Sequence, residues 1–255
     1  MPTAVLFDLD GVLIDTEGQY TAFWEQVGRD LLPHVPDLAS RIKGMTLVQI
    51  LHRFFDDDEV MCATVRQRLR VFEDTMDFPL LPGALEFVDA LRQAGYKVAV
   101  VTSSDEAKLA CLQRRYPDFV RHFDRIFTAE DSPRSKPEPD CYIGAAKFFG
   151  FEPETCFVFE DSLSGLTAGK ASGATVIGLT TSHPAEQIAA YTQATIADFT
   201  NYTVAQMCDV QKKHSKSYAR IFGRRCAQSD HAPFEGNESR GQKDCHADLL
   251  RLHHR

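Results

Sequence analysis

Two aspartates, Asp8 and Asp10, follow the first apolar segment of the chain, residues 4–7, and are separated by a single residue. Two carboxylates held in one buried place repel each other and lose their hydration, so a positive charge must compensate them. A divalent cation or a phosphate-binding lysine would provide that charge. Acidic pairs also occur in surface turns, so the pair gains meaning only from the segments that would lie beside it.

Two further segments carry groups that suit a phosphate. Residues 100–104 read Val-Val-Thr-Ser-Ser, and the hydroxyls of Thr102 and Ser103 can donate hydrogen bonds to phosphate oxygens. Lys136 precedes Pro137, where a helix is expected to begin, and helix N-termini attract anions. On its own, Lys136 could equally be a surface lysine at a helix end.

A second acidic pair, Glu160 and Asp161, ends another apolar run and is followed by Ser162 and Gly165. Carboxylate oxygens are the ligands that hard divalent cations prefer. Taken together, the four segments predict a site for a phosphate group and a magnesium ion. Glu160 has an alternative function, which is to support the neighbouring donors.

Short apolar runs rich in β-branched residues predict the strands that would position these groups. They lie at 4–7, 97–102, 125–128, 156–159 and 175–179, with a weaker run at 194–196. Helical segments that end at a glycine separate several of them, at 82–95, 137–150 and 164–173. This alternation predicts an α/β fold, a Rossmann-like parallel sheet flanked by helices. Ligands bind at the carboxyl ends of such strands, where all four polar segments lie.

The long interval between the first two runs predicts an inserted domain. We assign residues 1–15 and 85–206 to the α/β core and residues 16–84 to a helical cap. The alternative is that these helices pack on the core without acting as a lid. Residues 207–255 are polar and are expected to form a disordered tail, whose part from 211 onward has ten Lys/Arg and five Asp/Glu.

The composition predicts a cytoplasmic protein that binds neither nucleic acid nor a membrane. The net charge of −8 provides no attraction to anionic polymers or lipids. No apolar stretch reaches the roughly 20 residues that a membrane span needs. The seven cysteines are scattered and odd in number, which disfavours a disulfide framework. The sequence does not specify an oligomeric state and is compatible with a monomer.

The four segments resemble the motifs of the haloacid dehalogenase (HAD) superfamily, within it the β-phosphoglucomutase-like sugar phosphatases. The motifs occur in the family's order: D-L-D-G-V-L-I-D at 8–15, V-V-T-S-S at 100–104, S-K-P-E-P-D at 135–140 and F-E-D-S-x-x-G at 159–165. The resemblance extends over residues 1 to about 200. It implies a HAD core with a cap, and a magnesium-dependent phosphatase acting on a small phosphorylated metabolite, expected to be a sugar phosphate.

The resemblance also implies roles for the acidic residues. Asp8 resembles the nucleophile that forms an aspartyl-phosphate. Asp10 resembles the general acid and base. Magnesium would be held by the carboxylates of Asp8 and Asp161 and by the backbone carbonyl of Asp10, with Glu160 nearby. Because haloacid dehalogenases proper lack the second aspartate, Asp10 argues against dehalogenation.

The phosphate-binding residues follow from the same resemblance. Thr102 and Lys136 would bind the oxygens of the transferring phosphoryl group, and Ser103 is a further substrate-binding candidate. These residues complete the expected catalytic set with Asp8 and Asp10.

Two cap positions favour hydrolysis over transfer of the phosphoryl group to a sugar. β-Phosphoglucomutases have a histidine and an arginine where this chain has Tyr20 and Leu47. Leucine cannot replace the bidentate contacts of an arginine with a second phosphate. Lys43 is a candidate substitute for the missing charge, or else a solvated surface lysine. A phosphosugar mutase and a catalytically silent binding protein remain the alternative functions.

Overall fold

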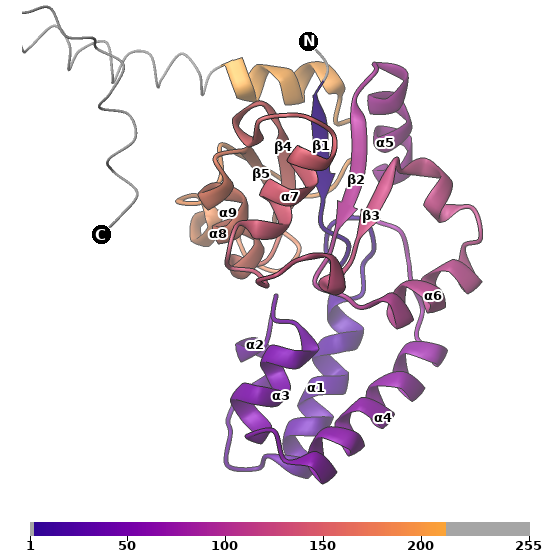
Figure 1. Ribbon diagram of the computed structural model, residues 1–255, viewed down its shortest axis with the longest axis vertical. Helices are drawn as coiled ribbons and strands as arrows, with labels where there is room; N and C mark the ends of the chain where they lie inside the picture. Colours follow the sequence, from indigo (N-terminus) through magenta and orange to yellow (C-terminus); the bar gives the residue numbers. More distant parts are fainter. Residues whose placement is uncertain (1–2, 213–255) are drawn as a thin grey trace, which may run out of the picture. The chain divides into compact units, whose positions relative to one another are not determined.

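The computed structural model describes residues 3–212, and six parallel strands form the sheet at their centre (Figure 1). The strands are β1 (Ala4–Phe7), β2 (Lys97–Val101), β3 (Arg125–Phe127), β4 (Phe157–Glu160), β5 (Thr175–Leu179) and β6 (Ala194–Ile196). Their order in the sheet is β3-β2-β1-β4-β5-β6, and every pair is parallel. The predicted α/β fold is confirmed. Because β1 pairs with both β2 and β4, the strand order reverses beside it, which is where such sheets bind ligands.

Both faces of the sheet are covered, which explains why its strands are almost continuously apolar. Val5 and Phe7 pack into one hydrophobic cluster together with Phe87 of α5 (Ala84–Gln93). Leu6, on the opposite face, packs into a second cluster with Tyr142 of α7 (Asp140–Phe148). Figure 1 shows α5 on one side of the sheet and α7, α8 (Leu163–Ser172) and α9 (Ala185–Ile188) on the other.

The helices of the core connect consecutive strands. They are α5 (Ala84–Gln93), α6 (Glu106–Arg115), α7 (Asp140–Phe148), α8 (Leu163–Ser172) and α9 (Ala185–Ile188), with 3₁₀ turns η1 (Phe119–His122), η2 (Ala129–Asp131) and η3 (Pro153–Thr155). Helix α6 was not predicted from the sequence. It begins after Asp105, whose side chain accepts a hydrogen bond from the backbone N–H of Lys108 at 3.0 Å, an N-cap that fixes the start of the helix.

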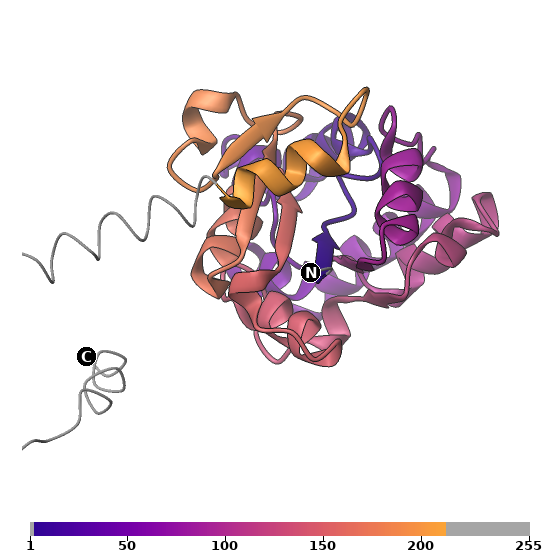
Figure 2. The same cartoon turned by 90° about the horizontal axis from the view of Figure 1, so that it is seen from above.

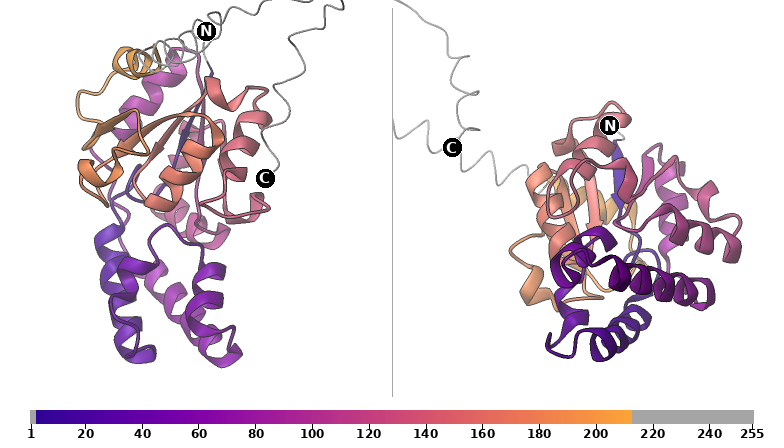
Figure 3. Two further views of the ribbon diagram at one scale, coloured as in Figure 1. Left: turned by 90° about the vertical axis from the view of Figure 1, so that its left-hand side faces the viewer. Right: turned by 60° about the horizontal axis from the view of Figure 1, so that its bottom comes forward.

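Four helices between β1 and β2 form a hydrophobic cluster of their own. They are α1 (Glu17–Leu31), α2 (Leu38–Arg41), α3 (Leu47–Phe55) and α4 (Glu59–Thr75). Trp24, Val27, Ile50 and Val65 lie in their shared interior. Figures 1 and 3 show these helices beyond the carboxyl ends of the strands. Helices α1 to α4 therefore lie over the edge of the sheet at which the four motifs are found.

The prediction that a disordered tail begins at residue 207 is wrong for residues 207–212. Residues 204–212 are helical and lie near the amino-terminal end of β1 (Figures 1 and 2). Met207 is fully buried in the cluster that contains Val5 and Phe7, and this burial holds the segment in place. The remainder of the expected tail, residues 213–255, lies outside the described residues. Among residues 3–212, no helix is long and apolar enough to cross a membrane.

We expect Phe87→Ala to lower the free energy of unfolding by about 3–5 kcal/mol, because it opens a cavity in the core. The Phe87 side chain is 3% exposed, and its ring lies 5.4 Å from that of Phe199. Phe148→Ala is a matched control, since Phe148 is 60% exposed, and it should cost about 1 kcal/mol or less. Equilibrium unfolding in urea measures both values. Equal losses would contradict the assignment of the core.

Candidate active site

Lys136 occupies the centre of the site, between two buried carboxylates. Its Nζ lies 2.6 Å from Asp8 Oδ1 and 2.6 Å from Glu160 Oε1, and it donates a hydrogen bond to the carbonyl of Val101 at 3.1 Å. Only 3% of Lys136 is exposed. Burial opposes its charge, but the carboxylates of Asp8 and Glu160 outweigh that effect and raise its pKa well above the ordinary value. The site therefore contains a permanent positive charge.

Glu160, at the end of β4, is saturated with hydrogen-bond donors. Its Oε1 accepts hydrogen bonds from Lys136 and from the hydroxyl of Tyr142, the latter at 2.9 Å. Its Oε2 accepts from the backbone N–H groups of Asp161 and Ser162 and from the Ser162 hydroxyl, at 3.0 to 3.2 Å. A Cβ at Gly165 would lie 1.6 Å from Glu160 Oε1, so only glycine fits there. Glu160 thus positions Lys136 and the loop after β4.

Three carboxylates form a buried acidic cluster at this edge of the sheet. Asp8, Glu160 and Asp161 each bring one oxygen within 4.8 Å of the others. Burial raises the pKa of Asp8 to about 7 despite the opposing effect of Lys136. Burial, with the nearby charges of Glu160 and Asp8, also raises the pKa of Asp161 well above its usual value. One lysine does not balance three buried carboxylates.

Asp161 is held against the loop that follows β1. Its Oδ2 accepts hydrogen bonds from the hydroxyls of Thr181 at 3.2 Å and Ser182 at 2.5 Å. Gly11 has a φ of +71°, and a Cβ there would lie 2.0 Å from Asp161 Oδ2. The close approach of Asp161 to the D-x-D loop therefore requires glycine at position 11.

The Asp10 carboxylate does not join this cluster. Both of its oxygens lie 2.5 Å from Lys108 Nζ, and Oδ2 accepts a hydrogen bond from the Ser104 hydroxyl at 3.0 Å. The Thr16 hydroxyl donates to Oδ1. Burial by itself would raise the pKa of Asp10, but Lys108, together with Thr16 and Ser104, outweighs it and lowers the pKa. Asp10 was expected to contribute its backbone carbonyl to a metal ion, and that role stays a prediction.

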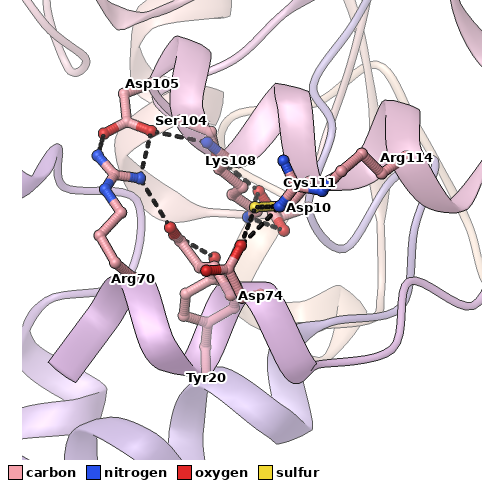
Figure 4. Close-up of polar contacts among 10 residues, drawn as sticks. Asp10, Tyr20, Arg70, Asp74, Ser104, Asp105, Lys108, Cys111 and Arg114 are labelled. Atoms are coloured by element: carbon pink, nitrogen blue, oxygen red, sulfur yellow. Dashed lines mark hydrogen bonds and ion pairs between the residues drawn. The ribbon is translucent and has the colours of Figure 1, made fainter. Parts of the chain in front are cut away.

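Lys108 and Asp105 connect the core to the helices of the insertion (Figure 4). Lys108 Nζ lies 4.2 Å from the ring centroid of Tyr20, whose hydroxyl donates to Glu73 at 2.9 Å. Arg70 binds Glu73 at 2.9 Å and Asp105 at 2.5 Å. Tyr20, Arg70 and Glu73 belong to α1 and α4, so contacts cross from these helices to Asp105 and Lys108 at the start of α6, and Lys108 in turn binds Asp10.

A cavity of about 610 Å³ lies between the strand ends and the inserted helices. Asp8, Asp10, Thr102, Ser103, Lys136 and Asp161 line it from the core, and Tyr20, Lys43 and Leu47 from the insertion. The Thr102 hydroxyl accepts a hydrogen bond from the backbone N–H of Ser104 at 3.0 Å. Lys43 already pairs with Glu17 at 3.1 Å.

The structure thus brings together most of the residues selected from the sequence. The exceptions are the Asp10 carboxylate, which binds Lys108 outside the acidic cluster, and Lys43, which pairs with Glu17. Asp8, Lys136, Glu160 and Asp161 are in contact or close to it, and Thr102 and Ser103 face the same cavity. Lys108 and Tyr142 were missed. Asp105 as an N-cap residue, followed by Glu106 in the first turn, could have revealed helix α6, but not the contact of Lys108 with Asp10.

Comparisons with known proteins identify the family of this chain. A family model described as haloacid dehalogenase-like hydrolase matches residues 2–173. A bifunctional riboflavin kinase/FMN phosphatase of Arabidopsis thaliana is 30% identical over 194 residues, 70% of this chain but 48% of that protein, so the chain spans about half its length. A phosphorylated carbohydrates phosphatase of Thermotoga maritima is 31% identical over 179 residues, 67% of this chain and 81% of that protein.

Solved structures include a HAD hydrolase of family IA, variant 3, from Entamoeba histolytica, with a TM-score of 0.72 at 25% identity. The match covers 82% of this chain and 99% of that one. Together with the family model and the four motifs at the strand ends, the match leads to one conclusion: this chain belongs to the haloacid dehalogenase-like hydrolases.

Proposed function

We propose that this protein is a magnesium-dependent phosphatase that hydrolyses a small sugar phosphate through an aspartyl-phosphate on Asp8. The observation that carries the proposal is the buried Asp8 carboxylate, which lies 2.6 Å from Lys136 and faces a cavity of about 610 Å³. A nucleophile beside a fixed positive charge suits phosphoryl transfer, in which charge on the phosphate oxygens must be stabilised.

The acidic cluster fits a hard divalent cation. Within residues 3–212, Asp8 Oδ2 and Asp161 Oδ1 accept no hydrogen bond, so both have lone pairs available, whereas Glu160 is saturated with donors. Asp8 and Asp161 would therefore hold the ion and Glu160 would support them. Magnesium prefers such oxygen ligands, and when bound it would offset the repulsion between Asp8 and an incoming phosphate.

The proposed reaction has two steps, in which Asp8 is the nucleophile and Asp10 the acid and then the base. In the first, an Asp8 oxygen attacks phosphorus, the bond from phosphorus to the leaving oxygen breaks, and Asp10 gives that oxygen a proton. In the second, water attacks the aspartyl-phosphate, Asp10 takes a proton from the water, and the bond from phosphorus to Asp8 breaks. Thr102, Ser103 and Lys136 would bind the phosphoryl oxygens throughout.

Asp10 must change its protonation state between these steps. Its lowered pKa suits the second step, in which it acts as a base. A phosphate dianion bound beside it would favour the protonated form needed in the first, because like charges close together repel.

Hydrolysis is favoured over transfer to a sugar because the insertion has no second phosphate-binding group at the expected positions. Tyr20 is engaged with Glu73 and Lys108, and Leu47 presents a hydrocarbon side chain to the cavity. Lys43 faces the cavity as well, but Glu17 already neutralises it, so a substrate would have to compete for its charge.

A sugar phosphate is the substrate class that we infer. The cavity volume suits a small metabolite. The Thermotoga relative, whose length this chain covers to 81%, is described as a phosphatase of phosphorylated carbohydrates. Residues of the inserted helices line the same cavity as Asp8, so these helices would act as a cap over the substrate.

We expect Asp8→Asn to reduce phosphate release by about 10⁴-fold or more, because an amide cannot replace the carboxylate nucleophile. Steady-state assays on a panel of sugar phosphates with magnesium measure the rates. Asp118→Asn is a matched control, since the Asp118 side chain is 73% exposed, and it should act like the wild type. If the Asp8 variant kept its activity, the mechanism would be wrong. A silent binding protein would release no phosphate with either chain.

Asp161→Asn should weaken magnesium binding by about 100-fold, since it removes one of the two available carboxylates. Titration calorimetry with magnesium chloride measures the affinity directly, without any assay of activity. Asp118→Asn should bind as the wild type does. An unchanged affinity in the Asp161 variant would remove this residue from the ligand set.

With β-glucose 1-phosphate and its bisphosphate activator, we expect inorganic phosphate and no glucose 6-phosphate, because Tyr20 and Leu47 provide no second phosphate-binding group. Coupled assays for the two products distinguish the reactions. Isomerisation without phosphate release would instead identify a mutase.

A further inference from the structure

Lys108 is an ammonium group buried beside the proposed acid and base. Only 3% of the residue is exposed, and its Nζ lies 2.5 Å from each oxygen of Asp10. Such a contact is a charge-assisted interaction with both oxygens, which fixes the orientation of a carboxylate as well as its charge. Thr16 and Ser104 each bind one of these oxygens, so within residues 3–212 only Lys108 holds both.

Lys108 is itself held from several sides. It belongs to the first turn of α6, where Asp105 caps the helix. The ring of Tyr20 lies 4.2 Å from its Nζ, a cation–π contact, and Glu73, only 4% exposed, accepts the hydrogen bond of the Tyr20 hydroxyl. Arg70 joins Glu73 to Asp105. Figure 4 shows these side chains converging from the core and from the inserted helices.

We propose that Lys108 is a positioning residue for the reaction: it holds the Asp10 side chain in the orientation from which Asp10 reaches the leaving oxygen. The proposal rests on the proposed function. It also assigns a purpose to Tyr20, which packs against the lysine that orients Asp10. Without Lys108, the buried Asp10 carboxylate would lose its only cationic partner among the described residues.

The test separates the orientation of Asp10 from a general effect on structure. An alkyl leaving group needs a proton to depart, whereas p-nitrophenolate leaves without one. The kcat/KM value reports on the step in which the leaving group departs. For Lys108→Met we expect kcat/KM to fall about 100-fold on the best sugar phosphate, since proton transfer to a leaving group typically contributes at least that factor. On p-nitrophenyl phosphate, whose leaving group needs no proton, we expect a loss of less than about 10-fold.

Two further variants define how the effect arises. In an Asp10→Asn background, Lys108→Met should cause little further loss on the sugar phosphate, because residues that act through one another are not additive. Lys108→Arg, which keeps the charge, should recover part of the lost kcat/KM. Arg115→Met, on the same helix and 59% exposed, is the matched control and should leave both substrates unaffected.

Each outcome decides the proposal. Circular dichroism establishes whether Lys108→Met folds; if it does not, Glu73→Gln carries the same substrate comparison, with a smaller loss in the same direction. Equal losses on both substrates, or a full additional loss in the Asp10→Asn background, would overturn the positioning role and leave the proposed phosphatase intact. A wild-type chain that releases phosphate from neither substrate would overturn both.

Discussion

The contact of Lys136 with two buried carboxylates is the interaction on which the rest of the site depends. Asp8 and Glu160 are 7% and 0% exposed, and burying a carboxylate at that depth is costly unless a cation lies beside it. The ammonium group lies 2.6 Å from each and also binds the carbonyl of Val101. One side chain thus joins the ends of β1, β2 and β4, the three neighbouring strands that deliver the site.

The need to pair and solvate buried carboxylates also explains why glycine occupies two positions beside the site, Gly165 and Gly11. Glu160 accepts all of its donors only because the chain turns tightly after β4, and no side chain beyond hydrogen fits at Gly165. Gly11 allows Asp161 to approach the D-x-D loop in the same way. These glycines therefore serve the packing of charge, and the acidic cluster that they permit is the feature that fits a divalent cation.

A second charged network lies at the junction with the inserted helices. Asp10 is paired with Lys108, while Arg70 and Glu73 of α4 reach Asp105 and Tyr20. The acidic residue proposed for proton transfer is therefore surrounded by groups from both parts of the chain. The residues proposed to bind the phosphoryl group belong to the core, whereas Tyr20, Lys43 and Leu47 line the cavity from the insertion. Under the proposed function, this division would place the chemistry at the sheet and the specificity in the insertion.

The sequence by itself determined the strands, the α/β class and the four motifs, because burial on both faces of a parallel sheet leaves a strong local pattern. It also selected Asp8, Glu160 and Asp161, since they follow apolar runs and parallel strands end at one edge, and Lys136, since it precedes an expected helix N-terminus. It missed Lys108, because a lysine in the first turn of a helix is usually solvated and nothing local shows that Asp10 lies beside it. It also placed the tail too early, because the burial of Met207 depends on distant residues. Tertiary structure alone decided which charges pair, because pairing requires contact between residues as far apart in sequence as Asp10 and Lys108.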